Sequence, residues 1–95
     1  MLDFFTIDLE ARAPELGRWR SYRITAGKDL FDQWLVEITF GRIGSRGRTI
    51  AQAAEDEAGA RRLVKANLRR RAGAPKRIGV AYQVVGRCDP MGWVS

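Results

Sequence analysis

Three arginines stand between closely spaced glycines near the middle of the chain. The segment LVEITFGRIGSRGRTIAQA spans residues 35–53. Its arginines and glycines are Arg42, Arg46, Arg48, Gly41, Gly44 and Gly47. A guanidinium group is planar and permanently charged, and it can form two parallel hydrogen bonds to one phosphate. Glycine adopts positive φ without steric cost, which suits tight turns and close backbone approach. We therefore predict that the arginines contact phosphate and that Gly41 and Gly44 let a ligand approach the backbone.

The ring of Phe40 adjoins these arginines and has two possible roles. Strand alternation places it on the same face as Trp34, Val36 and Ile38, which favours packing in the core. At the end of a strand, beside Gly41, the ring could instead stack on a sugar or a base. Periodicity favours the core, and both roles stay open.

Residues suited to catalysis are scarce in this chain. Histidine is absent, which removes the commonest general base and the commonest metal ligand. Asp29 and Asp32 are explained as turn residues, and the single cysteine, Cys88, cannot form an internal disulfide or a thiolate metal cluster. The glycine spacing matches neither GxGxxG nor a P-loop. We expect no enzymatic activity, no cofactor and no metal.

A second basic group follows the hairpin, and it extends through residues 61–77. No acid occurs between Glu57 and Asp89, although Glu57 itself could pair with Arg61 four residues later. The residues that we assign to a secondary basic surface are Arg62, Lys65 and Arg69. This segment could be a solvated helix face or a phosphate-facing surface. On the strand before the hairpin, Arg18, Arg20 and Arg23 could join the hairpin arginines, and Arg23 is the one that we assign to the site.

The overall charge points to a polyanionic partner. The 95 residues carry a formal charge of +6 with a pI near 10.4, which favours nucleic acid or an anionic membrane surface. There is no apolar run long enough to span a membrane, and the first residues do not resemble a secretion signal. We expect a cytoplasmic location and no membrane partner.

Hydrophobic periodicity predicts an α+β fold in one domain over residues 1–95. Strands are predicted over 4–9 and 18–26, then from about Gln33 to Phe40 and over 49–51, with a short last strand over 80–85. Loops are predicted over 10–17 and 27–29, with Leu30 and Phe31 as apolar anchors. A helix is predicted over 55–72, ended by Gly73 and Pro75, with acids in its first turn and arginines in its last. A basic connector over 76–79 and an irregular tail over 86–95, docking through Trp93, complete the prediction. The sheet is expected to be antiparallel, with four to five strands and the helix packed on it.

The segment FGRIGSRGR, residues 40–48, resembles the motif of the WGR domain, which is named for a Trp-Gly-Arg triplet followed by [VI]-G. The resemblance covers about residues 19–82 and includes Tyr22-Arg23-Ile24, Trp34-Leu35-Val36 and the predicted helix. WGR domains occur in the DNA-damage-dependent poly(ADP-ribose) polymerases and as small stand-alone bacterial proteins, and this chain is similar to the latter.

The resemblance implies a nucleic-acid-binding domain with a sheet and one helix. In the polymerases, the tryptophan of the triplet stacks on a sugar at a DNA break and its arginine supports contacts with DNA and with neighbouring domains. Those roles fall on Phe40 and Arg42 here, and phenylalanine keeps a stacking face but lacks the indole N–H.

We therefore predict a non-catalytic domain that binds nucleic acid, with DNA favoured over RNA, through phosphates and with little sequence specificity. The alternative is a protein-interaction module whose hairpin arginines dock on an acidic partner.

Overall fold

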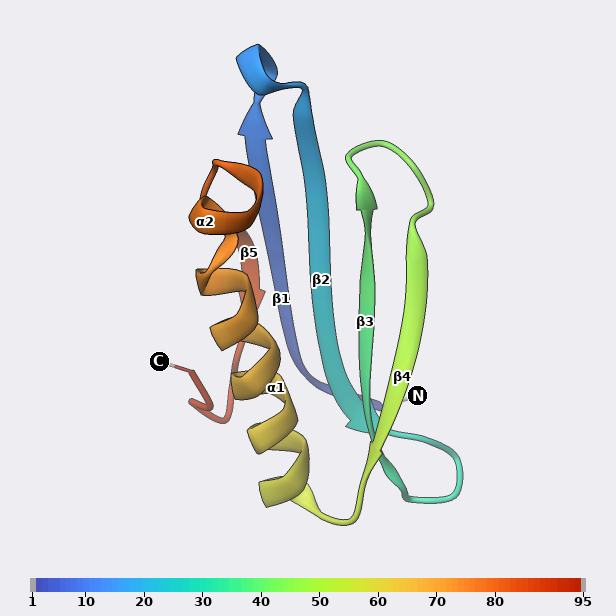
Figure 1. Ribbon diagram of the computed structural model, residues 1–95. Helices are drawn as coiled ribbons and strands as arrows, with labels where there is room; N and C mark the ends of the chain where they lie inside the picture. The colour runs from blue at the N-terminus through green and yellow to red at the C-terminus, as the bar shows by residue number, and fades with distance from the viewer. Residues whose placement is uncertain (1, 95) are drawn as a thin grey trace.

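The computed structural model describes residues 2–94 of the 95-residue chain. Five antiparallel strands form one sheet in the order β4-β3-β2-β1-β5, and a long helix crosses one face of it (Figure 1). The strands are β1 (Leu2–Ala13), β2 (Arg18–Lys28), β3 (Trp34–Arg42), β4 (Arg48–Ala54) and β5 (Gln83–Cys88). The helices are η1 (Pro14–Leu16), α1 (Glu57–Ala72) and α2 (Ala74–Ile78). The predicted α+β fold is confirmed.

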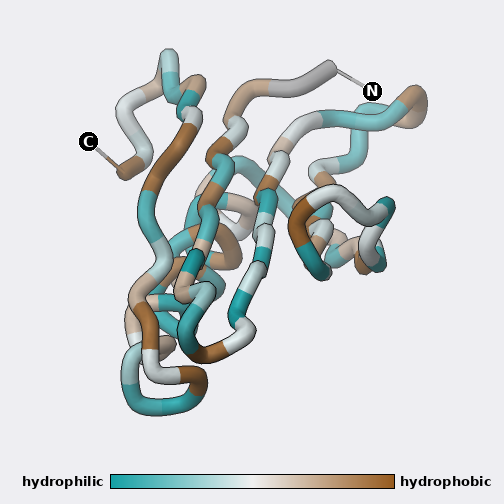
Figure 2. Tube along the Cα trace, turned by 90° about the horizontal axis from the view of Figure 1, so that it is seen from above, coloured by the Kyte–Doolittle hydropathy of each residue, from teal (hydrophilic) through white to brown (hydrophobic). Residues whose placement is uncertain are grey.

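Alternation along the strands gives the sheet two different faces. Hydrophobic and hydrophilic residues alternate along the strands (Figure 2). The face under α1, here called the helix side, carries a row of isoleucines that are paired across four strands: Ile7, Ile24, Ile38 and Ile50. The first three are almost fully buried, whereas Ile50 is 41% exposed. The opposite face, here called the open face, carries polar residues such as Thr25 and Thr39 at the alternate positions.

The C-terminal segment completes the core on the helix side. The ring of Trp93 is 3% exposed and stacks on Phe5 at 5.7 Å between centroids, with Trp34 at 5.9 Å. Asp89 holds this segment because its two carboxylate oxygens accept hydrogen bonds from the backbone N–H groups of Trp93 (2.8 Å) and Val94 (3.0 Å). The predicted docking through Trp93 is therefore confirmed.

Helix α1 follows the predicted pattern but begins two residues later than predicted. Asp56 caps it, with its Oδ1 accepting a hydrogen bond from the Gly59 backbone at 2.7 Å. Ala60 and Val64 are fully buried against the sheet, and Leu63 and Leu68 pack at the edges of this contact. The helix ends at Ala72 and Gly73 follows as its C-cap, as predicted.

Three local predictions were wrong around the ends of the elements. Residues 10–13 continue β1 instead of forming a loop, because Ala11 and Ala13 extend its buried face. The basic connector predicted over 76–79 is mostly helix α2, with Pro75 in its first turn, where a missing N–H costs nothing. The last strand is Gln83–Cys88 rather than 80–85, so the irregular tail starts after Cys88 rather than at Gly86.

The loop between β2 and β3 also differs from the prediction. Gly27 and Lys28 belong to β2, and Leu30 and Phe31 are 94% and 89% exposed instead of anchoring the loop. The cause is Asp29, whose Oδ1 accepts hydrogen bonds from the backbone of Phe31 (2.8 Å) and of Gln33 (3.0 Å). This tight turn directs the two apolar side chains into solvent.

Candidate nucleic-acid interface

The β3–β4 loop folds closely onto the end of β3. Gly47 has a φ of 69°, and a Cβ at this position would lie 2.6 Å from the carbonyl oxygen of Phe40. A Cβ on Gly41 would lie 2.8 Å from the Cα of Gly47. Gly44 has a φ of 88° but open space around it. Gly41 and Gly47 therefore allow the loop to close on itself, whereas Gly44 provides a backbone conformation that other residues rarely adopt.

Strand register places Phe40 between an aromatic residue and an arginine on the helix side of the sheet. Phe40 pairs with Tyr22 on β2 and with Arg48 on β4. In the next row towards the hairpin end, Arg42 pairs with Arg20. Side chains paired in this way lie about 5 Å apart at their Cβ atoms. The register therefore gathers Arg20, Arg42 and Arg48 around one ring.

Phe40 is partly buried and packs against the edge of the core. Helix α1 begins near the end of β4 that is far from the β3–β4 turn, and it slants sideways away from β4 as it rises (Figure 1). It therefore leaves the hairpin end of β3 and β4 uncovered. Phe40 is the last apolar residue of β3 on this side. The two roles considered for its ring are compatible, because one part of the ring packs inward and the rest is accessible.

Helix α1 is joined to the sheet next to Phe40 by buried polar contacts. The hydroxyl of Tyr22 donates to Asn67 Oδ1 at 3.3 Å, and Asn67 Nδ2 donates to Gln52 Oε1 on β4 at 3.2 Å. The guanidinium of Arg71 lies 4.7 Å from the centroid of the Tyr22 ring, which is a cation–π contact. Burial raises the pKa of the Tyr22 hydroxyl, and the charges of Arg71 and Arg70 oppose that rise.

Arg70 lies on the flank of α1 that faces β4. It follows Gly59 by eleven residues, which is three helical turns, and a Cβ on Gly59 would touch Ala54 of β4 at 3.4 Å. Together these side chains form a surface that we call the arginine face. Its members are Arg20, Arg42, Arg48, Arg70, Arg71, Tyr22 and Phe40.

Acidic side chains are segregated from the arginine face. In the strands whose side chains the structure describes, the acids are Asp8, Glu10 and Glu37, and alternation puts all three on the open face. The described ion pairs are Arg12–Glu10, Arg23–Asp8 and Lys28–Asp32. None of them includes an arginine of the arginine face, and four of its five arginines, all except Arg71, are exposed.

Two predicted site residues lie on the other side of the sheet. Arg46 extends over the open face, where it lines a shallow groove together with Arg23, Ser21 and Thr39. Arg23 is already paired with Asp8 at 3.3 Å. The structure therefore brings Arg42 and Arg48 together with Phe40 and separates them from Arg46 and Arg23.

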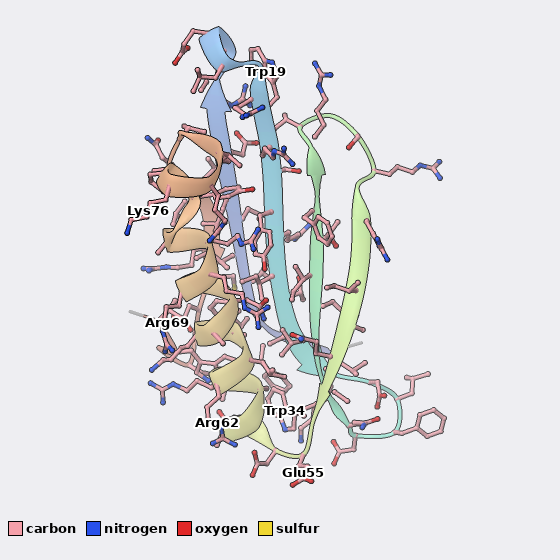
Figure 3. The ribbon with its side chains drawn as sticks, in the orientation of Figure 1. Trp19, Trp34, Glu55, Arg62, Arg69 and Lys76 are labelled. Atoms are coloured by element: carbon pink, nitrogen blue, oxygen red, sulfur yellow. The ribbon has the colours of Figure 1, made fainter. Side chains whose placement is uncertain are left out.

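The predicted secondary basic surface lies on α1, away from the hairpin. Figure 3 shows Arg69 on the side of the helix opposite the β3–β4 hairpin, and Arg62 near the start of the helix. Lys65 and Arg69 border a groove beside the C-terminal segment. Arg62 and Lys65 border its continuation towards Glu57. The expected ion pair between Glu57 and Arg61 is not formed among the described side chains.

The described residues have three further features. No helix in residues 2–94 combines the length and the apolar character needed to cross a lipid bilayer. Among the side chains that the structure describes, those of residues 4–94, no group of three or more His, Cys, Asp or Glu is arranged to hold a metal ion. Cys88 is exposed and unpaired by disulfide.

Sequence reasoning missed the contributions of Tyr22 and Arg71 to the site. Arg71 follows Ala60 by eleven residues and Val64 by seven, so its place on the core-facing stripe was available from the helical period. The pairing of Tyr22 with Phe40 was not available, because strand register depends on the whole sheet.

Comparison with known proteins gives one match. The family model of the WGR domain matches residues 5–74 of this chain. No curated protein and no solved structure matches it significantly. The matched region runs from β1 to the start of α2 and includes the sheet strands β1–β4, the hairpin and the whole of α1. Because this match covers most of the chain and agrees with the motif at residues 40–48, the protein belongs to the WGR domain family.

Proposed function

We propose that this protein binds nucleic acid, with DNA favoured over RNA, by contacting backbone phosphates with the arginine face. Nucleic-acid binding is the role ascribed to the WGR domain. The proposal depends on two neighbouring rows of paired residues on the helix side of the sheet, Tyr22–Phe40–Arg48 and Arg20–Arg42. The described side chains of the strands include no acid on that side. Phosphate contacts position a protein on nucleic acid without reading its sequence, so we expect little sequence specificity.

The arginines and the ring have separate roles in this proposal. Arg42 and Arg48 project from the end of the hairpin and are exposed, so each can make two hydrogen bonds to a phosphate. Phe40 lies between them and Tyr22, and its accessible edge can contact a sugar or an unpaired base at an end or a break. DNA is favoured because the motif resembles that of the DNA-damage-dependent polymerases.

Fluorescence anisotropy at several salt concentrations tests the proposal. If about four phosphates are neutralised, log K should fall with log salt at a slope near −3.6, which is roughly a hundredfold loss between about 50 and 200 mM. The substitution pair Arg42→Ala with Arg48→Ala should reduce this slope by about two. Arg46→Ala with Arg23→Ala is the matched control, since this pair also removes two charges, both of them on the open face. Salt-independent binding, or no binding at about 50 mM, would contradict the proposal.

Phe40→Leu separates stacking from charge. Leucine keeps an apolar side chain against the core but has no ring, so binding to an intact duplex should be unchanged. Binding to a nicked duplex or a single strand should weaken by roughly 1 kcal/mol or more if the ring stacks. An equal loss on all three ligands would show that Phe40 acts only through packing. If an acidic protein is retained by a variant that has lost DNA, the protein-interaction alternative is favoured instead.

A further inference from the structure

A second basic groove runs along the other flank of α1. Its lining includes Arg61, Arg62, Lys65, Arg69, Met91 and Trp93, and we call it the tail groove. Its wider part has a volume of about 580 Å³. The C-terminal segment forms one wall, fixed by the hydrogen bonds of Asp89, so this shallow, open groove is part of the folded structure.

Three of the four cations that line the tail groove form a regular ladder. Arg61, Lys65 and Arg69 are spaced four residues apart, so they follow one another along the helix at about 6 Å intervals. Glu57 is the one acid that borders the groove, at its end. Like charges at this spacing destabilise a helix by mutual repulsion. An extended anion in the groove would remove this repulsion, whereas water and small ions relieve it only in part.

The arginine face and the tail groove point in different directions. Arg70 lies on the flank of α1 towards β4, while Arg61 and Lys65 face the C-terminal segment. Figure 1 shows the hairpin on one side of α1 and the C-terminal segment on the other. Because the two surfaces face opposite flanks of α1, a straight duplex that lies along one flank does not lie along the other.

We propose that the tail groove binds a second segment of nucleic acid through its phosphates, so that one copy of the protein bridges two segments. This inference rests on the proposed function, because the arginine face must hold the first segment. Bridging differs from simple binding because it brings two duplexes together at low protein concentration.

A capture assay with two duplexes tests the proposal. One duplex is fixed to beads, the other carries a fluorophore, and the protein must hold both for fluorescence to stay on the beads. The groove variant combines Arg61→Ala, Lys65→Ala and Arg69→Ala, which are exposed helix positions where alanine preserves helicity. The control combines Arg12→Ala, Arg23→Ala and Arg46→Ala on the open face, and it also removes three positive charges.

We expect the natural protein and the control to retain the fluorescent duplex on the beads. The groove variant should retain roughly tenfold less fluorescence. Anisotropy on one duplex should show that the groove variant still binds. Retention by the groove variant would overturn the proposal, since it would mean bridging through a dimer. An equal loss of bead fluorescence in the control would also overturn the proposal. The proposal would fail as well if the natural protein bound one duplex but did not capture a second. Failure to bind any duplex would instead refute the proposed function itself.

Discussion

Gly47 occupies the most crowded backbone position of the hairpin loop. Its φ is 69°, and a Cβ here would lie only 2.6 Å from the Phe40 carbonyl oxygen, so both features exclude a side chain. We expect Gly47→Ala to lower the free energy of unfolding by about 3 kcal/mol, as for a strained backbone position. Gly44→Ala should cost only about 1 kcal/mol, because the surrounding space is open. Urea unfolding measures both, and similar losses would contradict this account of the loop.

Asn67 is a buried polar residue, 5% exposed, that links three elements. It accepts from the Tyr22 hydroxyl and donates to Gln52 and to the carbonyl of Leu63. We expect Asn67→Leu to cost roughly 1–3 kcal/mol, because it leaves the buried partners without hydrogen bonds. Tyr22→Phe removes one of these bonds and should cost about 1 kcal/mol. The double variant should lose less than the sum, which thermal unfolding can measure.

At the scale of elements, the C-terminal segment depends on one carboxylate. Desolvation alone would raise the pKa of Asp89, but the backbone hydrogen bonds from Val94 and Trp93 outweigh it and lower the pKa below its ordinary value. Because the pKa of Asp89 is lower in the folded state than in the unfolded state, the ionised carboxylate stabilises the fold at pH values above its unfolded-state pKa. This stabilisation is lost as the pH falls through the folded-state pKa. We expect Trp93 to undock in that acid range, with a change in tryptophan emission. Asp89→Asn should weaken docking at neutral pH and flatten this acid transition.

Most elements could be predicted from the sequence because their patterns are local. The alternation in Phe5, Ile7 and Leu9 and the helical spacing of Ala60 and Val64 each appear within a few residues. Weak signals caused the errors. Alanine at positions 11 and 13 is equally compatible with a strand and with a loop. The apolar character of Leu30 does not indicate that hydrogen bonds of the Asp29 side chain turn this residue towards solvent.

The candidate site was less predictable because it depends on register. The sequence places Arg42, Arg46 and Arg48 within seven residues, yet the fold sends Arg46 to the open face. Conversely, Arg20 and Arg42 come together only because β2 and β3 pair in one register. Spacing identified the residue types that could bind phosphate, while the choice of face required the complete sheet.

At the scale of the whole molecule, charge is unevenly distributed along the longest axis of 45 Å. Asp29, Asp32 and Glu55 lie at the end formed by the β2–β3 loop and the start of α1, and Figure 3 shows Glu55 there. The hairpin and α2, with their arginines, lie at the other end (Figure 1). Such a distribution is a dipole, which turns the basic end towards a polyanion before contact.

Glu55→Lys tests this orientation effect without touching either basic surface. Glu55 lies beyond the end of β4, about 20 Å along the strand from Arg48. The substitution should raise the association rate with a duplex roughly two- to threefold at about 10 mM salt, where the Debye length is about 30 Å. At about 150 mM the rate should be unchanged, and stopped-flow anisotropy can measure both. A change that persists at the higher salt would point to direct contact instead.

The exposed Leu30 and Phe31 have a consequence for how the protein behaves in concentrated solution. They form an apolar tip at the acidic end, where the carboxylates of Asp29 and Glu55 repel those of a second copy. Salt shortens the range of that repulsion and strengthens apolar adhesion. The salt that releases a bound duplex will therefore also favour precipitation of the released protein, and Leu30→Ser with Phe31→Ser should restore its solubility.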